Sequence, residues 1–230
     1  MEVNTQAIIR LAWARTLGLA DDALMQPAAE RLVRVDESII MFVSLWQHRV
    51  LIGPQWLVDQ APALSNAALA SGSRLLGLAA GHGGRLLEET VLGFTDDYVS
   101  LPGLDDAQVS KDARSVGELE RSCPPDDVAE VGLSQMSEHF VTLDAEGRPK
   151  AVAGYGESQG ILASIGVLVP PSQRLAGHGT LAAAVATNDA LDAGLVAQWR
   201  ARRGHRGGLG VARRLGYREI GAQTTLLLHA

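Results

Sequence analysis

The chain has 230 residues, of which 47% are hydrophobic, and a formal net charge of −6 at pH 7. This acidic balance argues against a dedicated nucleic-acid-binding protein, which is usually basic, and the single cysteine excludes an internal disulfide framework. No apolar run approaches the about 20 residues of a membrane-spanning helix, and the N-terminus lacks the features of a signal peptide, so we expect a cytoplasmic protein without membrane or nucleic-acid partners.

The N-terminal half has the pattern of a small α/β unit. A helix is expected over 4–17, because apolar residues recur there at a spacing of four residues. The following residues predict, in order, strands over 39–46 and 50–52, a helix over 66–80 and a strand over 90–101. The first Gly-His-Gly, at 81–83, follows a helical pattern, where glycine commonly supplies the left-handed residue that ends a helix. We assign residues 1–104 to this unit.

Residues 105–127 differ in character, with many acidic side chains, few large apolar ones and the Pro124-Pro125 pair. We expect a connector there, with one helix over 113–121. Residues 128–230 are then expected to form a second domain. Its pattern predicts, in order, three strands within 139–169, a helix over 177–193, a strand over 194–201, a helix over 208–215 and a strand over 222–229. This order is that of a layered α/β fold.

One stretch of the second domain combines the features of an anion-binding site. Residues 169–191 run from a strand through Arg174, Gly177 and Gly179 into an alanine-rich helix. The first turn of a helix presents free N–H groups and a partial positive charge, which suits an anion. A tight turn without a ligand is the alternative at this point.

Other nucleotide-binding and metal-binding patterns fit the sequence poorly. No glycine is followed by the lysine of a phosphate-binding loop. Ala182 stands where a dinucleotide-binding fingerprint has its third small residue, after an unusual turn that contains two prolines. The six histidines do not follow the spacing of metal ligands, so we expect no metal.

The segment Arg174-Leu175-Ala176-Gly177-His178-Gly179 resembles the Q/R-x-x-G-x-G/A loop of the GNAT superfamily of N-acetyltransferases. The preceding Val169–Gln173, the stretch ALDAGLVAQWRA and the later Leu215-Gly216-Tyr217 resemble neighbouring blocks of the same family, so the resemblance covers about Val128–His229. It implies a mixed sheet with flanking helices, an α/β fold, in the second domain. The N-terminal half would then be a degenerate copy of this fold or a lid over the acceptor.

The resemblance also implies how coenzyme A would bind. Glycines let the backbone approach the pyrophosphate, the helix N-terminus adds its dipole, and an arginine adds a charged contact. The edge of the strand over 161–169 would bind the pantetheine amides, and an N–H near Val167–Val169 would stabilise the oxyanion. The residues that the resemblance assigns to the coenzyme are Val167, Leu168, Val169, Arg174, Leu175, Ala176, Gly177, His178, Gly179, Thr180, His205 and Gly208.

The sequence departs from the family at the position of the catalytic acid. The tyrosine that members place before Leu-Gly-Phe falls on Ala212 here, and their asparagine falls on His205. We expect Tyr217 to pack in the core rather than to act as the acid. Tyr155 stays an open candidate.

The general base is equally open. An acceptor amine with a pKa near ~10 must lose a proton before it attacks. The strand over 161–169 has no carboxylate, and the nearest candidates are Glu157 and Glu138. Removal of the proton by water is the default expectation.

These observations predict an acyl-CoA-dependent N-acyltransferase, an enzyme that transfers acetyl from acetyl-CoA to a primary amine by direct attack in a ternary complex. The acceptor would be a small-molecule or peptide amine, and the protein a homodimer. One alternative is a catalytically silent protein that binds CoA in a regulatory role. A doubly wound nucleotide-binding module is the other.

Overall fold

The computed structural model describes residues 1–28 and 30–228. The packing of its Cα atoms divides these residues into two compact units. Unit 1 comprises 1–9, 94–200 and 206–218, and unit 2 comprises 10–93, 201–205 and the described part of 219–230. The domain boundaries expected after residues 104 and 127 stay a prediction, and His229, at the end of the last expected strand, lies outside the described residues.

Unit 2 is built from the N-terminal elements and the last strand. Its strands follow the order β1-β3-β2-β10-β4, with β1 parallel to β3 and with β2 antiparallel to both β3 and β10. Apolar side chains of β2, β3 and β10 form its core with the short helices α2 to α4. The elements are α1 (Val3–Thr16), β1 (Leu32–Val35), β2 (Ile39–Leu45), β3 (His48–Gly53), α2 (Gln55–Gln60), η1 (Ala61–Ala63), α3 (Asn66–Leu69), α4 (Gly72–Leu78), η2 (Ala80–His82), β4 (Arg85–Thr95) and β10 (Arg218–Leu227).

The expected helix over 66–80 is in fact two helices. The side chain of Ser71 accepts a hydrogen bond from the Arg74 N–H and caps α4, so that α3 ends before it. A serine at such a position competes with helix continuation, because its oxygen satisfies an N–H that begins a new helix. Gly83 adopts the left-handed conformation expected of the first Gly-His-Gly, with φ of 69°.

Unit 1 holds the elements of the second half of the chain except the last strand, β10. Its strands follow the order β9-β8-β7-β6-β5, antiparallel from β5 to β8, whereas β8 and β9 are parallel. The helix expected over 113–121 is confirmed as α5, and the neighbouring α6 was not expected. The elements are β5 (Val109–Ser110), α5 (Ala113–Arg121), α6 (Pro125–Val131), η3 (Leu133–Gln135), β6 (Glu138–Leu143), β7 (Pro149–Ser158), β8 (Leu162–Leu168), η4 (Pro171–Gln173), α7 (His178–Asp192), β9 (Val196–Arg202) and α8 (Arg206–Arg214).

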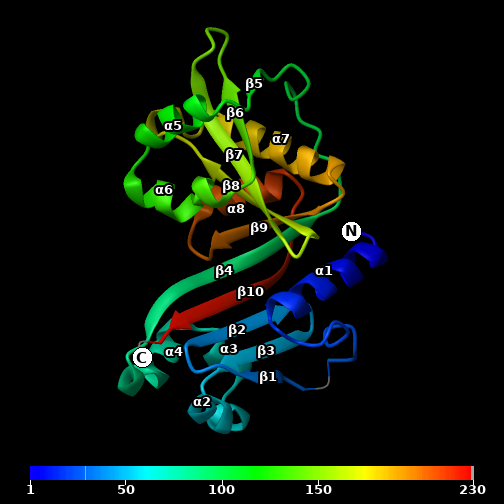
Figure 1. The fold of residues 1–230 in the computed structure, drawn as a ribbon, viewed down its shortest axis with the longest axis vertical. Coiled ribbons are helices and arrows are strands. Elements are labelled where there is room, and N and C mark those ends of the chain that lie inside the picture. The colour runs from blue at the N-terminus through cyan, green and yellow to red at the C-terminus, as the bar shows by residue number, and fades with distance from the viewer. Residues whose placement is uncertain (29, 229–230) are drawn as a thin grey trace. The chain divides into compact units, whose positions relative to one another are not determined.

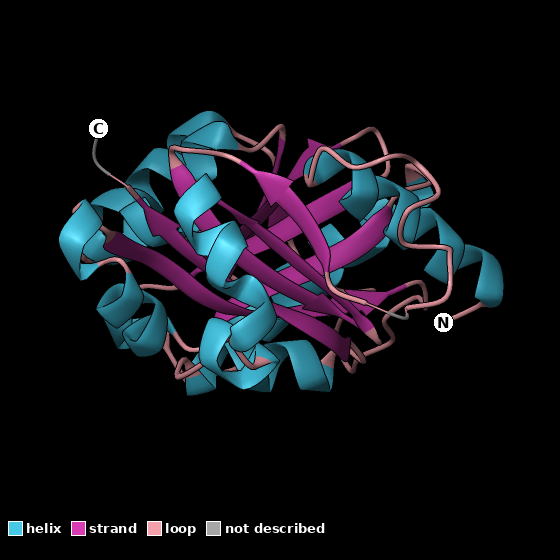
Figure 2. Cartoon of the chain, turned by 90° about the horizontal axis from the view of Figure 1, so that it is seen from below, coloured by secondary structure: helices cyan, strands magenta, loops and turns pink. Residues whose placement is uncertain are grey.

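Helices cover both faces of the strands of unit 1 (Figure 1). Side chains alternate between the two faces of a strand. Leu168 of β8 packs with α5 and α6 in an apolar cluster, whereas its neighbours Val167 and Val169 lie next to Gly179 at the start of α7. We therefore distinguish an α5/α6 face and an α7 face. Figure 2 shows helices lying against the strands. No helix among the described residues combines the length and apolar character of a membrane span.

Candidate functional site

Strands β8 and β9 pair over only part of their lengths. The pairing begins with Leu162 opposite Val196 and ends with Ile165 opposite Trp199, although β8 continues to Leu168. The Val196 N–H donates to the Ile161 carbonyl at 2.9 Å. Because alternate residues of a strand turn their polar backbone groups to the same edge, those of residues 163, 165, 167 and 169 also face the β9 side. Among the described residues, Val167 is thus the first on this edge without a β9 partner, and we call the edge over 166–169 the open edge.

The open edge leads into a loop with unusual backbone conformations. Leu175 has φ of 64° and is fully exposed, and Gly177 has φ of 89°. The Leu181 N–H makes the first helical bond of α7, to the Gly177 carbonyl at 3.0 Å, so the preceding amides of the first turn point out of the helix. Left-handed residues next to a helix N-terminus direct successive N–H groups toward one point, an arrangement that suits an anion.

The two glycines of this loop serve the fold differently. A Cβ on Gly177 would meet nothing within 4 Å, so its positive φ is what requires glycine. A Cβ on Gly179 would lie 2.7 Å from Cγ2 of Val169 and 3.5 Å from Cγ1 of Val167. Glycine at 179 therefore lets the first turn of α7 pack directly on the end of β8.

Arg174 lies at the end of the open edge. Its Nη2 forms an ion pair with Oδ2 of Asp127 at 2.6 Å, and its Nε donates to the Val169 carbonyl at 3.2 Å. The expectation for Arg174 was a contact with phosphate. The carboxylate of Asp127, which comes from α6, was not anticipated.

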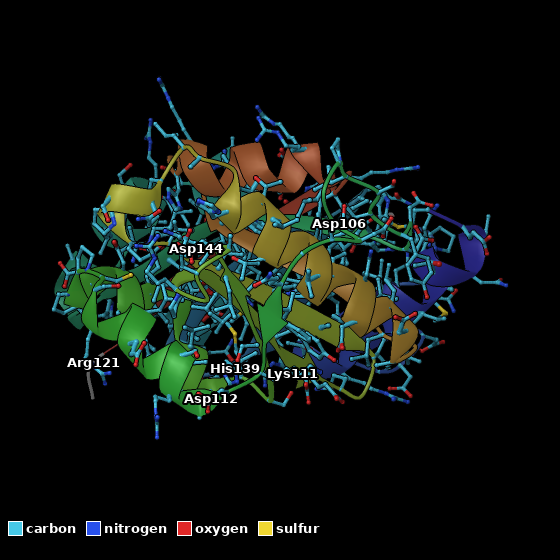
Figure 3. The ribbon with its side chains drawn as sticks, turned by 90° about the horizontal axis from the view of Figure 1, so that it is seen from above. Asp106, Lys111, Asp112, Arg121, His139 and Asp144 are labelled. Atoms are coloured by element: carbon cyan, nitrogen blue, oxygen red, sulfur yellow. The ribbon has the colours of Figure 1, made fainter. Side chains whose placement is uncertain are left out.

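Two of the catalytic candidates, Tyr155 and Glu138, meet in one polar cluster. The buried Tyr155 hydroxyl donates to Oδ2 of Asp189 at 2.8 Å, and burial, followed by this hydrogen bond, raises the pKa of Tyr155 above its usual value. Nζ of Lys111, labelled in Figure 3, lies 3.2 Å from Oε2 of Glu138 and 3.4 Å from Oδ1 of Asp189. It also stands over the ring of Phe140, 4.5 Å from the centroid.

This cluster lies on the α7 face, far from the glycine loop. Asp189 comes twelve positions after Gly177, which corresponds to about 18 Å along an α-helix. These hydrogen bonds and ion pairs hold the side chains of Tyr155 and Glu138 in one network, in which Tyr155 is buried and Glu138 is half-buried. Glu157, the third candidate, is exposed near the end of β7.

The segment Gly156-Glu157-Ser158-Gln159-Gly160 has the Gly-x-Ser-x-Gly spacing of a serine nucleophile, which the sequence analysis missed. Such a serine requires a sharp turn from a strand into a helix. Here Gly156, Glu157 and Ser158 end strand β7, and Gln159 and Gly160 form the turn to the antiparallel strand β8, with φ of 59° and 64°. This geometry is that of a hairpin and does not support a nucleophile.

The later residues of the resemblance are placed as follows. His205 is exposed in unit 2, where its N–H donates to the Arg202 carbonyl at 2.9 Å, and Gly208 lies in the first turn of α8. Ala212 is buried in the same helix. Tyr217 is buried against Trp199, with ring centroids 5.4 Å apart, and its hydroxyl shares a 2.8 Å hydrogen bond with Thr187, which is the environment of a core residue.

The α5/α6 face next to the open edge holds residues that the sequence analysis passed over. Gly154 of β7 and Gly166 of β8 are Cα partners, and the side chain of Met136 covers them. Nε2 of Gln198 lies 3.4 Å from Oγ of Ser164 beside this pair. The period of two along β8, which puts Ser164, Gly166 and Leu168 on one face, is the sequence signal that could have found this surface. Within residues 1–28 and 30–228, no three His, Cys, Asp or Glu side chains gather to hold a metal ion.

The chain has counterparts among solved structures. A GNAT-family protein from Novosphingobium aromaticivorans matches with a TM-score of 0.51 and 18% identity, over 64% of this chain and 67% of its own. The chain has a GNAT-like fold. A Drosophila protein matches with a TM-score of 0.50 and 14% identity, over 67% of this chain and 56% of its own. A GCN5-related N-acetyltransferase-like protein from Streptococcus suis is 21% identical, with a TM-score of 0.48, over 68% of this chain and 67% of its own.

The GNAT-like fold confirms the α/β class and the mixed sheet with flanking helices that the sequence predicts. The chain spans about two thirds of the Novosphingobium protein and just over half of the Drosophila protein. No protein-family model matches the sequence, and no curated protein is similar enough to be matched. At these identities the likeness establishes the GNAT-like fold alone.

Proposed function

We propose that the protein is an acyl-CoA-dependent N-acyltransferase, which transfers acetyl from acetyl-CoA to a primary amine by direct attack in a ternary complex. The observation that carries this proposal is the continuity of the open edge with the left-handed loop at the N-terminus of α7. An extended amide chain can bind to the first as an added strand, and a pyrophosphate can bind to the second.

In this proposal the loop amides of Leu175 to Thr180 hold the pyrophosphate, and Arg174 adds a charged contact. The pantetheine lies along Val167 and Val169, whose polar backbone groups face the open edge. Leu168 belongs to the same segment, but its side chain is buried in the cluster with α5 and α6. Its role in binding the coenzyme is therefore to support the open edge. His205 and Gly208 stay proposed contacts farther along the chain.

The chemistry needs few groups from the protein. The amine nitrogen attacks the thioester carbon, the carbonyl becomes an oxyanion that accepts a hydrogen bond from the Val167 N–H, and the C–S bond then breaks. Water takes the proton of the amine, because the described carboxylates Glu138 and Glu157 do not stand on the open edge. The CoA thiolate leaves unassisted, since a thiol with a pKa near ~8.5 is a tolerable leaving group.

The domain layout and the assembly are part of the same proposal. Residues 128–230 would form the domain that binds the acyl donor, and residues 105–127 would connect it to the N-terminal half. Residues 1–104 would be a degenerate copy of the fold or a lid over the acceptor. The protein would act as a homodimer in the cytoplasm.

Release of free thiol from acetyl-CoA in the presence of a panel of amines tests the activity. An amine-dependent release supports the proposal. Binding of CoA without release for any amine would favour the catalytically silent CoA-binding protein. Stabilisation by a dinucleotide but not by CoA in a thermal-shift assay would favour the nucleotide-binding module instead.

The pH dependence of the transfer follows from the groups present. Burial raises the pKa of Tyr217 above its usual value, so its hydroxyl stays protonated from pH 6 to 9 and contributes no titration there. We expect the rate to rise with pH to above ~8 as the amine with a pKa near ~10 loses its proton, without a falling limb.

Tyr217→Phe should leave kcat within a few-fold of the wild type. A general acid accelerates a reaction by about 10²–10⁴-fold, whereas a ring that only packs in the core does not. A bell-shaped profile, with a hundredfold loss in folded Tyr217→Phe, would identify Tyr217 as the acid.

Removal of the Arg174 guanidinium should weaken CoA binding. A hydrogen bond to a charged group contributes about 1.5–3 kcal/mol, but Arg174 is already paired with Asp127, so we expect the lower end, a loss of about tenfold. Calorimetric titration of Arg174→Ala with CoA measures this loss. Arg148→Ala, in the exposed turn before β7, is the control and should bind as the wild type does. Equal affinity in both variants would remove Arg174 from the site.

A further inference from the structure

A pair of glycines on the α5/α6 face leaves a depression that one methionine fills. Gly154 and Gly166 stand opposite each other on β7 and β8. A Cβ on Gly166 would collide with Cε of Met136 and would lie 3.1 Å from Cγ1 of Val131. A Cβ on Gly154 would collide with the backbone carbonyl of Glu138 and would lie 3.1 Å from Sδ of Met136. The thioether of Met136 therefore occupies the space of the missing side chain at Gly166 and borders Gly154.

This depression adjoins the start of the open edge. Gly166 directly precedes Val167, the first residue of β8 whose polar groups have no β9 partner. Val167 itself turns toward Gly179 on the α7 face, so that face is already filled there. A group that accepts a hydrogen bond from the Val167 N–H therefore lies next to Gly166. On the α5/α6 face, the position of Gly166 is covered by Met136, so the bound group would contact Met136 there.

We propose that Met136 sets the length of the acyl group that the enzyme accepts. The inference rests on the proposed function, because it takes the thioester to lie at the start of the open edge. With the pyrophosphate at the loop that follows β8, the pantetheine runs back along the strand, and its acyl end comes to Gly166, directly after Ile165, the last residue of β8 that pairs with β9. The thioether leaves room for acetyl and excludes longer chains.

The backbone that carries Met136 is held in place, so the limit lies in its side chain. The Met136 N–H donates to the Leu133 carbonyl at 2.9 Å, and the Ser137 N–H donates to the Tyr155 carbonyl at 3.0 Å. Nε2 of His139, labelled in Figure 3, lies 2.8 Å from the same Leu133 oxygen. Substitution at 136 should therefore change the volume of the depression without moving the segment. Met136 is half-buried, so part of this residue is exposed to solvent.

Titration calorimetry with CoA, acetyl-CoA, butyryl-CoA and hexanoyl-CoA tests this inference. The wild type should bind hexanoyl-CoA at least tenfold more weakly than acetyl-CoA. Met136→Ala should bind acetyl-CoA within twofold of the wild type, and should gain about fourfold in affinity for each methylene that the opened space admits. Its preference for acetyl over hexanoyl should fall by at least tenfold.

Three further variants make the result specific. Met136→Leu keeps the volume and should keep the preference for acetyl. Met136→Val removes less volume than alanine, should shift the preference part of the way, and serves if the alanine variant does not fold. Gln135→Ala truncates the exposed neighbouring side chain and should behave as the wild type does.

The outcomes separate this inference from the proposed function. If the wild type binds none of the four compounds, the proposed function fails, and the inference fails with it. If Met136→Ala and Met136→Val bind CoA normally and keep the preference of the wild type, the inference is overturned while the proposed function stands. A loss of the acetyl preference in Gln135→Ala as large as that in Met136→Ala would also overturn it.

Discussion

Gly177→Val is expected to weaken CoA binding at least a hundredfold, or about 2.7 kcal/mol. Gly177 has φ of 89°, a conformation that a β-branched residue adopts only as an outlier. A valine would return to negative φ and rotate the adjoining peptide groups, so that the loop amides would no longer converge on one point. Because a Cβ at this position meets nothing within 4 Å, no repacking of the core accompanies the change. Calorimetric titration with CoA measures the loss.

Gly194→Val is the matched control for this substitution. Gly194 follows the other end of α7 with φ of 78°, and a Cβ there also meets nothing within 4 Å. The two variants should therefore lose comparable amounts of thermal stability, whereas CoA affinity should fall only in Gly177→Val. Equal affinities in the two variants, whether both unchanged or both reduced, would mean that the loop conformation does not hold the coenzyme.

Much of the fold follows from local patterns in the sequence. The alanine-rich helix after Gly177 became α7, and the run around Trp199 became β9, each within a few residues of its expected bounds. The expected helix bounds were wrong where a single residue determines whether a helix begins. Ser71 starts a new helix inside an expected one, and Pro125 begins α6 at a position where a proline pair suggested a loop, although proline is well suited to the first turn of a helix.

In the candidate site, too, the features that depend on consecutive residues could be predicted from the sequence, and the contacts between distant residues could not. The glycine loop is local, because its conformations depend on a few consecutive residues, and the sequence could predict it. The partners of Arg174 and Tyr155 are not local: Asp127 lies 47 positions before Arg174, and Asp189 lies 34 positions after Tyr155. Met136 gains its place above Gly166 only when the segment that carries it packs against β8 in the folded chain. No spacing within a single segment reveals such pairs.

Val167→Pro is expected to lower kcat by about 10²–10³-fold, the usual effect of removing one oxyanion donor. Proline lacks the backbone N–H that the proposed mechanism directs at the thioester oxygen. The polar groups of Val167 face the open edge rather than β7, as the bond between Val196 and Ile161 indicates. The substitution therefore removes no ladder bond to β7, and proline is tolerated on such an edge. Steady-state kinetics of thiol release, with kcat and KM measured separately, give the result.

Val167→Ala separates the N–H from the side chain. It keeps the backbone donor and trims only the group that lies near Gly179 on the α7 face, so its kcat should stay within a few-fold of the wild type. Circular dichroism and thermal unfolding show whether Val167→Pro keeps its fold. A folded Val167→Pro that turns over as fast as Val167→Ala would place the oxyanion donor elsewhere. A loss confined to KM would assign the Val167 N–H to holding the pantetheine, because an interaction made equally before and in the transition state changes KM but not kcat.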